Sequence, residues 1–202
     1  MACDCDIEVR DASQKKILLT LLLINGVMFI SEIGVGIMAD STGVIADSLD
    51  MLADAMVYAI GLAAVGKALS RKNDAARVSG YFQVGIAVLV MVDIIRRFVG
   101  GSEPVSSLML IISCVALAAN LFCLYLISKE RTGEVHMRAS WIFSKNDVLA
   151  NLGVIIAGAL IYFTGSRWPD LIIGSIITIV VLRGGIQILK EAKADKEAQK
   201  AG

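Results

Sequence analysis

The sequence has no net charge, a single histidine and few aromatic residues. Its 202 residues carry 19 Lys and Arg against 19 Asp and Glu, with a single histidine. Most basic residues lie outside the long apolar runs, which argues against a nucleic-acid-binding surface or one for acidic substrates. Aromatic residues make up only 6% of the chain. This scarcity disfavours a binding pocket for organic cations, which typically uses aromatic rings.

The sequence also lacks a signal peptide and a disulfide framework. Residues 1–16 have neither the basic start followed by a short apolar core nor the small-residue cleavage site of a secretory signal. Of the four cysteines, Cys114 and Cys123 lie inside an apolar run, while Cys3 and Cys5 are too close together for an ordinary disulfide. We therefore expect a cytoplasmic N-terminus and no structural disulfides.

Long apolar runs are what the sequence does have. Hydrophobic residues make up 56% of the chain and its mean hydropathy is +0.73, so little sequence remains for a soluble domain. About 20 apolar residues cross the hydrocarbon of a bilayer. Six segments come near that length, and we predict an all-α membrane protein with six transmembrane helices in a compact bundle. The spans are roughly 16–38, 43–66, 79–99, 106–128, 142–164 and 169–189.

The charged residues orient these spans. An even number of crossings puts both ends on one side, and most Lys and Arg flank the N-terminus, the second and fourth loops and the C-terminus, so these are predicted to be cytoplasmic. The opposite loops are short and carry turn residues, so consecutive helices should be antiparallel neighbours. The predicted organisation is a cytoplasmic tail at 1–15, a transporter domain at 16–189 and a charged cytoplasmic tail at 190–202.

The second span contains three carboxylates that lipid should reject. Each aspartate near the middle of a span costs roughly 2.5–3.5 kcal/mol on insertion scales. Asp47, Asp50 and Asp54 recur at helical spacing and share one face, with Asp50 and Asp54 one turn apart. That face must therefore look into the bundle or into a water-filled cavity.

Two ionised carboxylates one turn apart repel each other, so a cation or protons should neutralise them. Metal and proton binding would then compete for Asp50 and Asp54. A hydrated pair, or one hydrogen-bonded to Ser or Asn of other helices, is the alternative. Asp47 lies nearer the outer end, where a capping or packing role is more natural than direct ligation, and it is kept as a secondary candidate.

The fifth span places Asp147 and Asn151 one turn apart on one face. The run Asp147-Val-Leu-Ala-Asn151 resembles Asp50-Met-Leu-Ala-Asp54, and the two spans run in opposite directions, as in inverted-topology repeats that share a site. This similarity makes Asn151 the counterpart of Asp54. The predicted metal ligands are therefore Asp50, Asp54, Asp147 and Asn151.

Other polar residues suggest weaker interpretations. Glu32 could line an entry route or pair with a neighbour, and Asn25 and Asn120 could bridge helices. Asp93 is expected to form an ion pair with the arginines at 96 and 97. The remaining candidates are Cys3, Cys5 and His136. Because thiolate and imidazole suit soft metals, these residues could capture a metal at the cytoplasmic entrance. The alternative is that they are incidental residues of a tail and a loop.

These two spans resemble the signatures of the cation diffusion facilitator family of metal exporters. The run Ser41-Thr-Gly-Val-Ile-Ala-Asp47-Ser-Leu-Asp50-Met-Leu-Ala-Asp54 is similar to the second-helix signature, and Asp147-Val-Leu-Ala-Asn-Leu-Gly153 to the fifth-helix signature. Ile95-Arg-Arg97 followed by Pro104-Val105 matches the passage between the third and fourth helices. The resemblance covers all six predicted spans and implies metal binding at Asp50, Asp54 and Asp147.

Two departures from the family pattern stand out. Most members have a histidine four residues before the fifth-helix aspartate, where this chain has Phe143. The fourth ligand is then Asn151, Ser144, Asn146 or water, and an oxygen-rich site leaves Fe, Mn and Co open beside Zn and Cd. Members also commonly carry a cytoplasmic C-terminal metal-binding domain, and this sequence is expected to be a form without it.

The expected function is efflux of a divalent transition metal (Zn, Cd, Co, Fe or Mn) by proton antiport with alternating access. No permanently bound cofactor, enzymatic activity or nucleic-acid partner is expected, and the metal is the substrate. The family implies a homodimer, and membrane lipid and the plasma membrane are the expected surroundings. Two alternatives remain: an intramembrane aspartyl or metal-dependent enzyme, and a proton-coupled exporter of organic cations.

Overall fold

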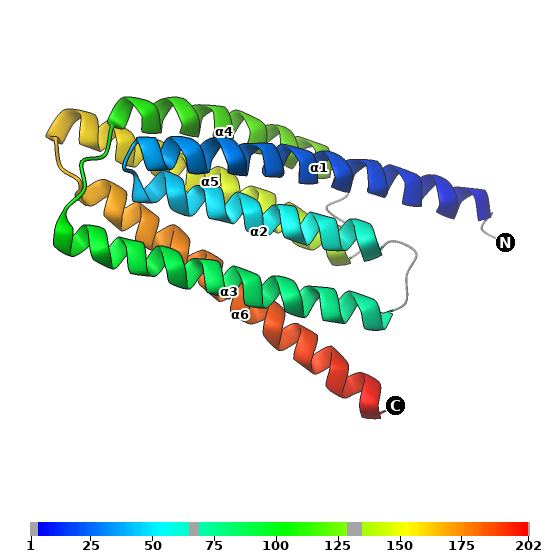
Figure 1. The fold of residues 1–202 in the computed structure, drawn as a ribbon. Helices are drawn as coiled ribbons and strands as arrows, with labels where there is room; N and C mark the ends of the chain where they lie inside the picture. The colour runs from blue at the N-terminus through cyan, green and yellow to red at the C-terminus, as the bar shows by residue number, and fades with distance from the viewer. Residues whose placement is uncertain (1–3, 65–68, 129–134, 202) are drawn as a thin grey trace.

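Six long helices form the whole described structure. The computed structural model describes residues 4–64, 69–128 and 135–201, and within them no strand occurs. The helices lie side by side along one direction (Figure 1), which confirms the predicted all-α membrane bundle. They are α1 (Asp4–Met38), α2 (Thr42–Ala64), α3 (Leu69–Gly100), α4 (Ser106–Ser128), α5 (Val135–Thr164) and α6 (Trp168–Ala201).

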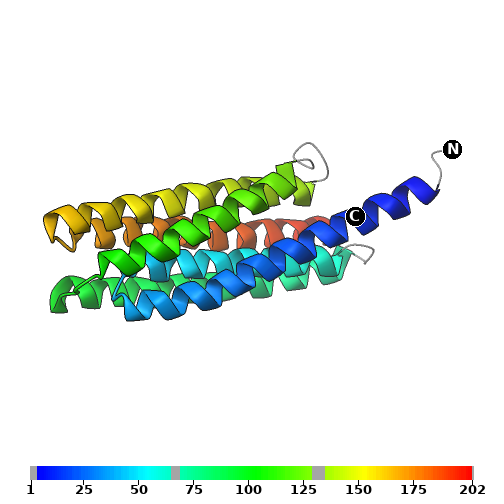
Figure 2. The same ribbon diagram turned by 90° about the horizontal axis from the view of Figure 1, so that it is seen from above.

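The helices extend past the predicted spans at one end of the bundle. α1 begins twelve residues before the span predicted from residue 16, and α6 continues twelve residues beyond 189. The extension of α6 is rich in Lys, Glu and Ala, which favour helix, whereas that of α1 is mixed and includes three Asp, and no proline interrupts either. The first turn of α1 and the last turn of α6 lie at the same end of the molecule (Figures 1 and 2), as an even number of crossings requires.

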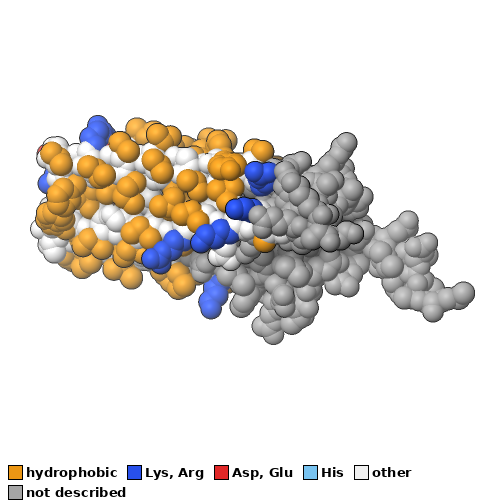
Figure 3. Space-filling model, turned by 90° about the horizontal axis from the view of Figure 1, so that it is seen from below, with side chains coloured by type: hydrophobic (Ala, Val, Ile, Leu, Met, Phe, Trp, Pro, Cys, Tyr) orange, Lys and Arg blue, Asp and Glu red, His pale blue; other side chains and the backbone are white. Residues whose placement is uncertain are grey.

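Hydrophobic side chains cover the described part of the bundle. Four helices contain stretches long and apolar enough to cross a membrane, at Lys15–Met38, Ser106–Ser128, Asp147–Thr164 and Trp168–Lys190. Many large apolar side chains on them face outward, among them Ile30, Phe122 and Leu160. The face shown in Figure 3 is mostly hydrophobic, and its Lys and Arg side chains gather mainly toward the residues drawn in grey. This is the surface of a multi-pass integral membrane protein.

α2 is the helix with the most neighbours. It packs against α1, α3, α5 and α6, while α3 packs on α6 and α4 on α5 and α1. Although α2 carries three aspartates, these neighbours shield it from lipid, so Asp47 and Asp54 are 2% and 3% exposed. The bundle therefore buries the acidic face of α2, as the aspartate spacing predicts.

Glycines allow close approach where α2 begins. A Cβ on Gly174 of α6 would lie 2.7 Å from Thr42 Cγ2 and 2.9 Å from the Thr42 carbonyl carbon. A Cβ on Gly36 of α1 would lie 2.9 Å from Ile45 Cγ1. Small residues at such crossings let helix backbones pack closely in lipid. These two positions fix the outer half of α2 against α1 and α6.

The turn between α1 and α2 is a Schellman motif with aspartate in the left-handed position. The Ser41 amide donates to the Gly36 carbonyl at 3.0 Å and the Asp40 amide to the Ile37 carbonyl at 3.2 Å, which is the pairing that defines the motif. Asp40 has a φ of +49°, where glycine is usual. The side chain that glycine would lack binds the neighbouring loop and α3.

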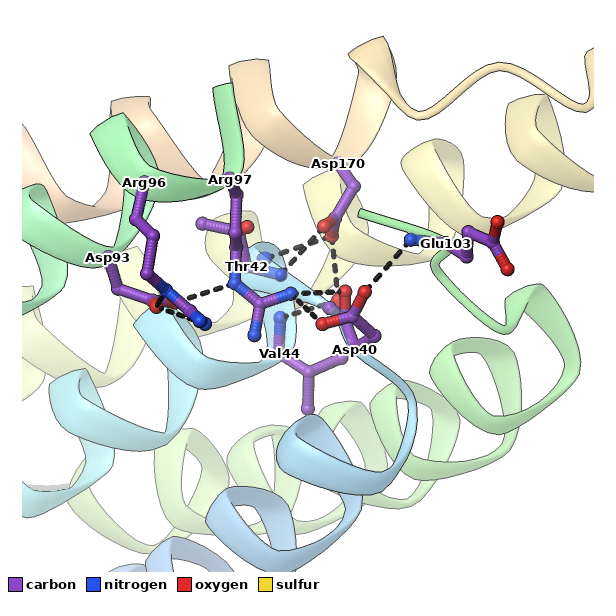
Figure 4. Close-up of polar contacts among 10 residues, drawn as sticks. Asp40, Thr42, Val44, Asp93, Arg96, Arg97, Glu103 and Asp170 are labelled. Atoms are coloured by element: carbon purple, nitrogen blue, oxygen red, sulfur yellow. Dashed lines mark hydrogen bonds and ion pairs between the residues drawn. The ribbon is translucent and has the colours of Figure 1, made fainter. Parts of the chain in front are cut away.

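An ion-pair network ties this turn to α3 and to the loop before α4 (Figure 4). Arg97 pairs with the carboxylate of Asp40, and its guanidinium also donates to the Asp40 carbonyl at 2.7 Å. Asp93 accepts from Arg97 at 2.6 Å and from Arg96 at 2.8 Å, which confirms the expected ion pair. The Glu103 amide donates to Asp40 at 2.8 Å. We call this network of Asp40, Asp93, Arg96, Arg97 and the Glu103 amide the outer clasp.

Asp170 of α6 caps α2 across the helix boundary (Figure 4). Its carboxylate accepts from the Thr42 amide at 2.7 Å, the Gly43 amide at 2.9 Å and the Ser41 hydroxyl at 2.6 Å. The first amides of a helix have no partner within it and carry partial positive charge. A buried carboxylate from another helix therefore satisfies the start of α2 and fixes it against α6.

We predict that Asp170→Ala destabilises the bundle by at least about 2 kcal/mol, because it leaves three buried donors without an acceptor. Asp170→Asn keeps one acceptor oxygen and should lose less. Thermal unfolding of the detergent-solubilised protein measures both. Equal melting temperatures for Asp170→Ala and the wild type would contradict the capping role.

We also predict that Gly174→Ala lowers the thermal stability by about 1–3 kcal/mol, since the added methyl group meets the backbone of Thr42. The matched control is Gly26→Ala on α1, where a Cβ meets nothing within 4 Å and the helix should be unchanged or slightly more stable. The same melting assay compares them. A control as unstable as Gly174→Ala would show that the loss does not come from the α2–α6 contact.

Candidate metal centre

Three carboxylates from two helices converge inside the bundle. Asp50 and Asp54 lie one turn apart on α2, and α5 runs antiparallel to α2 and brings Asp147 to them. One carboxylate oxygen from each of the three lies within 4.8 Å of the other two. Asp54 and Asp147 are 3% exposed and Asp50 is half-buried. We call this group the aspartate triad.

The triad has the spacing and chemistry of a cation site. Oxygen ligands of a transition metal lie about 2.0–2.2 Å from the ion, so two oxygens on one ion are at most about 4.4 Å apart. The triad is already close to that arrangement. Three anionic groups at this separation and depth repel one another strongly unless a cation or protons neutralise them.

Two hydroxyl groups position the carboxylate of Asp54. Tyr58, one turn beyond Asp54, is fully buried and donates to Asp54 Oδ2 at 2.9 Å. Its oxygen also lies 3.2 Å from Ser144 Oγ on α5. The chain Asp54–Tyr58–Ser144 links α2 to α5 and holds one oxygen of Asp54. Asp54 also shares a side-chain hydrogen bond with Asp147.

Asn151 presents a free acceptor next to Asp147. Its amide nitrogen donates to the Asp147 backbone carbonyl at 2.9 Å, while its Oδ1 is buried without a hydrogen-bond partner among the described residues. Asp147 Oδ2 is likewise buried without a partner. A buried oxygen without a donor is costly in a protein interior. Both atoms are therefore suited to coordinate a cation.

The other predicted site residues are placed as follows. Ser144 is fully buried and touches the site through Tyr58. Asp47 is buried but lies outside the group of three. Asn25 donates to the Leu21 carbonyl at 2.9 Å and lies 3.9 Å from Cys123 Sγ, so it connects α1 with α4. Three further candidates fall in helices, but their side chains lie outside the described part of the structure; these are Cys5, His136 and Asn146. Cys3 lies outside the described residues altogether.

Tyr58 is the site residue that sequence reasoning did not single out. Its only signal is position, four residues after Asp54 on the acidic face of α2. An aromatic residue at that spacing in an apolar span suggests packing, and its hydroxyl partner on α5 becomes visible only when the two helices are placed together.

A cavity of about 360 Å³ between α2, α5 and α6 reaches Asp50. Asp50 is its one polar lining residue among apolar side chains such as Ile173 and Ile177. The cavity explains why Asp50 is less buried than its two partners.

We predict that Tyr58→Phe weakens divalent metal binding by about 10- to 100-fold, because Asp54 loses the donor that orients it. Titration of the detergent-solubilised protein with Co²⁺ or Zn²⁺ by calorimetry measures the change. Tyr162→Phe, which alters a 70% exposed tyrosine, is the control and should bind as the wild type does. Unchanged affinity in Tyr58→Phe would contradict the positioning role.

Comparison with known proteins identifies the family of this chain. Residues 18–195 match the family model described as the cation efflux transmembrane domain. The chain is 27% identical over 195 residues to a cadmium, cobalt and zinc/H(+)-K(+) antiporter of Bacillus subtilis, covering 90% of this chain and 62% of that protein. It is 28% identical over 197 residues to the zinc transporter ZitB of Yersinia pseudotuberculosis, covering 91% and 62%.

A third relative is the metal cation efflux system protein CzcD of Cupriavidus metallidurans, 25% identical over 194 residues that cover 86% of this chain and 61% of that protein. The chain thus spans somewhat more than three-fifths of the length of these curated relatives. All three are named for metal cation transport. The family match covers nearly the whole described bundle and confirms the resemblance seen in the second and fifth spans, so this chain belongs to the cation efflux family.

Proposed function

We propose that this protein carries divalent transition-metal cations out of the cytoplasm in exchange for protons. The observation that carries the proposal is the convergence of Asp50, Asp54 and Asp147 within 4.8 Å in the interior of a membrane bundle. Buried charge of one sign at this depth needs a counter-ion. The names of the relatives, which include zinc, cadmium and cobalt, support a divalent metal as that ion.

The donor set favours a borderline or hard metal. The triad supplies carboxylate oxygens, and Asn151 Oδ1 and Ser144 offer further oxygens. Oxygen donors accept Zn²⁺, Co²⁺, Fe²⁺ and Mn²⁺, whereas Cd²⁺ gains more from thiolate or imidazole. We therefore propose Zn²⁺ or Co²⁺ as the principal substrates, with Fe²⁺, Mn²⁺ and Cd²⁺ as further candidates.

Proton exchange follows from the chemistry of the ligands. A carboxylate that binds a metal must be deprotonated, so metal and protons compete for the same oxygens. A metal arriving from the cytoplasm would displace protons from the triad, and protons entering from outside would displace the metal. The cargo and the coupling ion would thus share Asp50, Asp54 and Asp147.

The outer clasp supports alternating access as the transport cycle. In this structure the α1–α2 turn, α3 and the loop before α4 are joined by Arg97, Asp40 and the Glu103 amide. Opening the outer end would require α2 and α3 to separate there, which breaks the pair between Arg97 and Asp40. We propose that this structure is a state closed at the outer end.

The remaining predictions on surroundings are also proposals. The hydrophobic surface would lie in the plasma membrane in contact with lipid, and a homodimer would form through membrane helices. An intramembrane enzyme and an organic-cation exporter gain no support from the comparisons, because the relatives are named for metal cations.

We expect the protein in liposomes to move Zn²⁺ or Co²⁺ in the direction opposite to the flow of protons down their gradient. Asp54→Asn should reduce that metal flux by at least about tenfold through loss of transition-metal ligation. The control is Glu103→Gln, which removes an exposed carboxylate at the outer end and should transport normally. A metal-sensitive dye inside the liposomes reports the flux. Wild-type flux in Asp54→Asn would contradict the site, and flux independent of the proton gradient would contradict antiport.

A further inference from the structure

Glu32 is a carboxylate in the bundle with no role in the aspartate triad. It lies on α1, is 1% exposed, and neither of its side-chain oxygens has a hydrogen-bond partner among the described residues. A carboxylate inside a membrane helix is costly, and an unpaired one more so. A buried carboxylate that lacks a partner within the protein points to a ligand.

The contact between α1 and α2 sets the level of Glu32. A Cβ on Gly36 of α1 would lie 2.9 Å from Ile45 Cγ1 and 3.1 Å from the Ile45 backbone nitrogen, so these two residues are level with each other. The helices are antiparallel, so one turn back from Gly36 on α1 lies opposite one turn onward from Ile45 on α2. Glu32 therefore lies level with residues 48 and 49, between Asp47 and Asp50.

Asp47 is the second acidic residue at this level. It is 2% exposed and its Oδ1 is buried without a partner. Glu32 on α1 and Asp47 on α2 are thus two buried carboxylates at one level of the bundle, each with at least one unpaired oxygen.

The depth of this pair relates it to the triad. At 1.5 Å per residue, Glu32 lies about 9 Å from the outer end of α1, and Asp47 about 7.5 Å from the start of α2. Asp50 and Asp54 lie about 12 Å and 18 Å along α2. The carboxylates therefore form a descending series in which Asp50 lies between the pair and the deeper members of the triad.

From this placement we propose that Glu32 and Asp47 form a second, outward station for the divalent cation, which the ion occupies between the aspartate triad and the outer side. The inference rests on the proposed function, since it takes the triad as the main site. Asp50 is the shared carboxylate through which an ion passes from one station to the other. The capping or packing role expected for Asp47 then gives way to transient ligation.

The station differs from the triad in ways that suit an exit step. It has two carboxylates instead of three, and no tyrosine hydroxyl holds either of them among the described contacts. Fewer charges and a less fixed geometry give weaker binding. An ion leaving toward the outside would therefore meet a site of lower affinity directly below the outer clasp.

The test separates the two stations by disabling the deeper one. Asp54→Asn should leave one Co²⁺ bound per chain, about 10- to 100-fold more weakly than in the wild type. Adding Glu32→Gln or Asp47→Asn to this variant should abolish the residual binding, while adding Glu103→Gln should not. Equilibrium dialysis of the full chain in lipid nanodiscs with Co²⁺ measures the bound metal. The two isosteric additions lie on different helices, so a folding failure of one leaves the other as a test.

Single variants complete the experiment. In an otherwise wild-type chain, Glu32→Gln should retain Co²⁺ binding at the triad within about threefold but slow Zn²⁺ flux in liposomes by about tenfold. Residual Co²⁺ binding in Asp54→Asn that survives both Glu32→Gln and Asp47→Asn would overturn the second station, as would the absence of any residual binding. If the wild type neither binds nor transports metal, the proposed function fails. If the wild type does both, but adding Glu32→Gln or Asp47→Asn changes binding no more than adding the control Glu103→Gln, only the outward station fails.

Discussion

The burial of negative charge on α2 is the constraint on which the rest of the structure depends. An aspartate in the middle of a membrane span is energetically costly in contact with lipid, and α2 carries three, so α2 must pack against protein on its acidic face. α1, α3, α5 and α6 provide that surround. The same enclosure that makes α2 insertable buries Asp47 and Asp54, and in the proposed function this burial serves to bind an ion.

The position of α2 is set mainly at its outer end. Asp170 holds its first amides, Gly36 and Gly174 let α1 and α6 approach, and the Asp40 turn ties it through Arg97 to α3. Further inward, one side-chain link to α5 is the hydrogen-bonded chain through Tyr58 and Ser144. A helix fixed at one end and linked by hydroxyl groups near the site can shift its carboxylates by a small rocking motion, which is the movement that exchange between two sides of a membrane needs.

The polar residues of the bundle fall into two classes. In the outer clasp and the Asp170 cap, each anion has a guanidinium or an amide as its partner, and these groups hold helices together. Along the acidic face of α2 and around it, oxygens of Asp47, Asp147, Asn151 and Glu32 have no donor among the described residues. The first class is satisfied by the protein itself. In the proposed function a cation completes the second class, and that difference would separate structural from functional carboxylates in this fold.

The sequence by itself determined the six apolar helices, their alternating direction and the candidate ligands Asp50, Asp54 and Asp147. Apolar length and helical spacing carry that information locally, and a carboxylate in an apolar span is anomalous wherever the span packs. Asn151 was proposed from the similarity between two segments, and its free oxygen beside Asp147 keeps it a candidate. The ends of α1 and α6 were harder to predict than the spans, because both helices continue past the apolar runs and apolar length marks only the part within the bilayer.

Only the tertiary structure decided which polar groups meet across helices. Tyr58 reaches Ser144, Asp170 caps α2 and Asp40 pairs with Arg97 across sequence separations of 57 to 129 residues. Nothing in the spacing along one helix reveals the rotation of its neighbour, so these partners could not be derived from periodicity. For the same reason the sequence left Glu32 an isolated carboxylate. The packing of α1 on α2 placed it at the level of Asp47, and both carboxylates are buried.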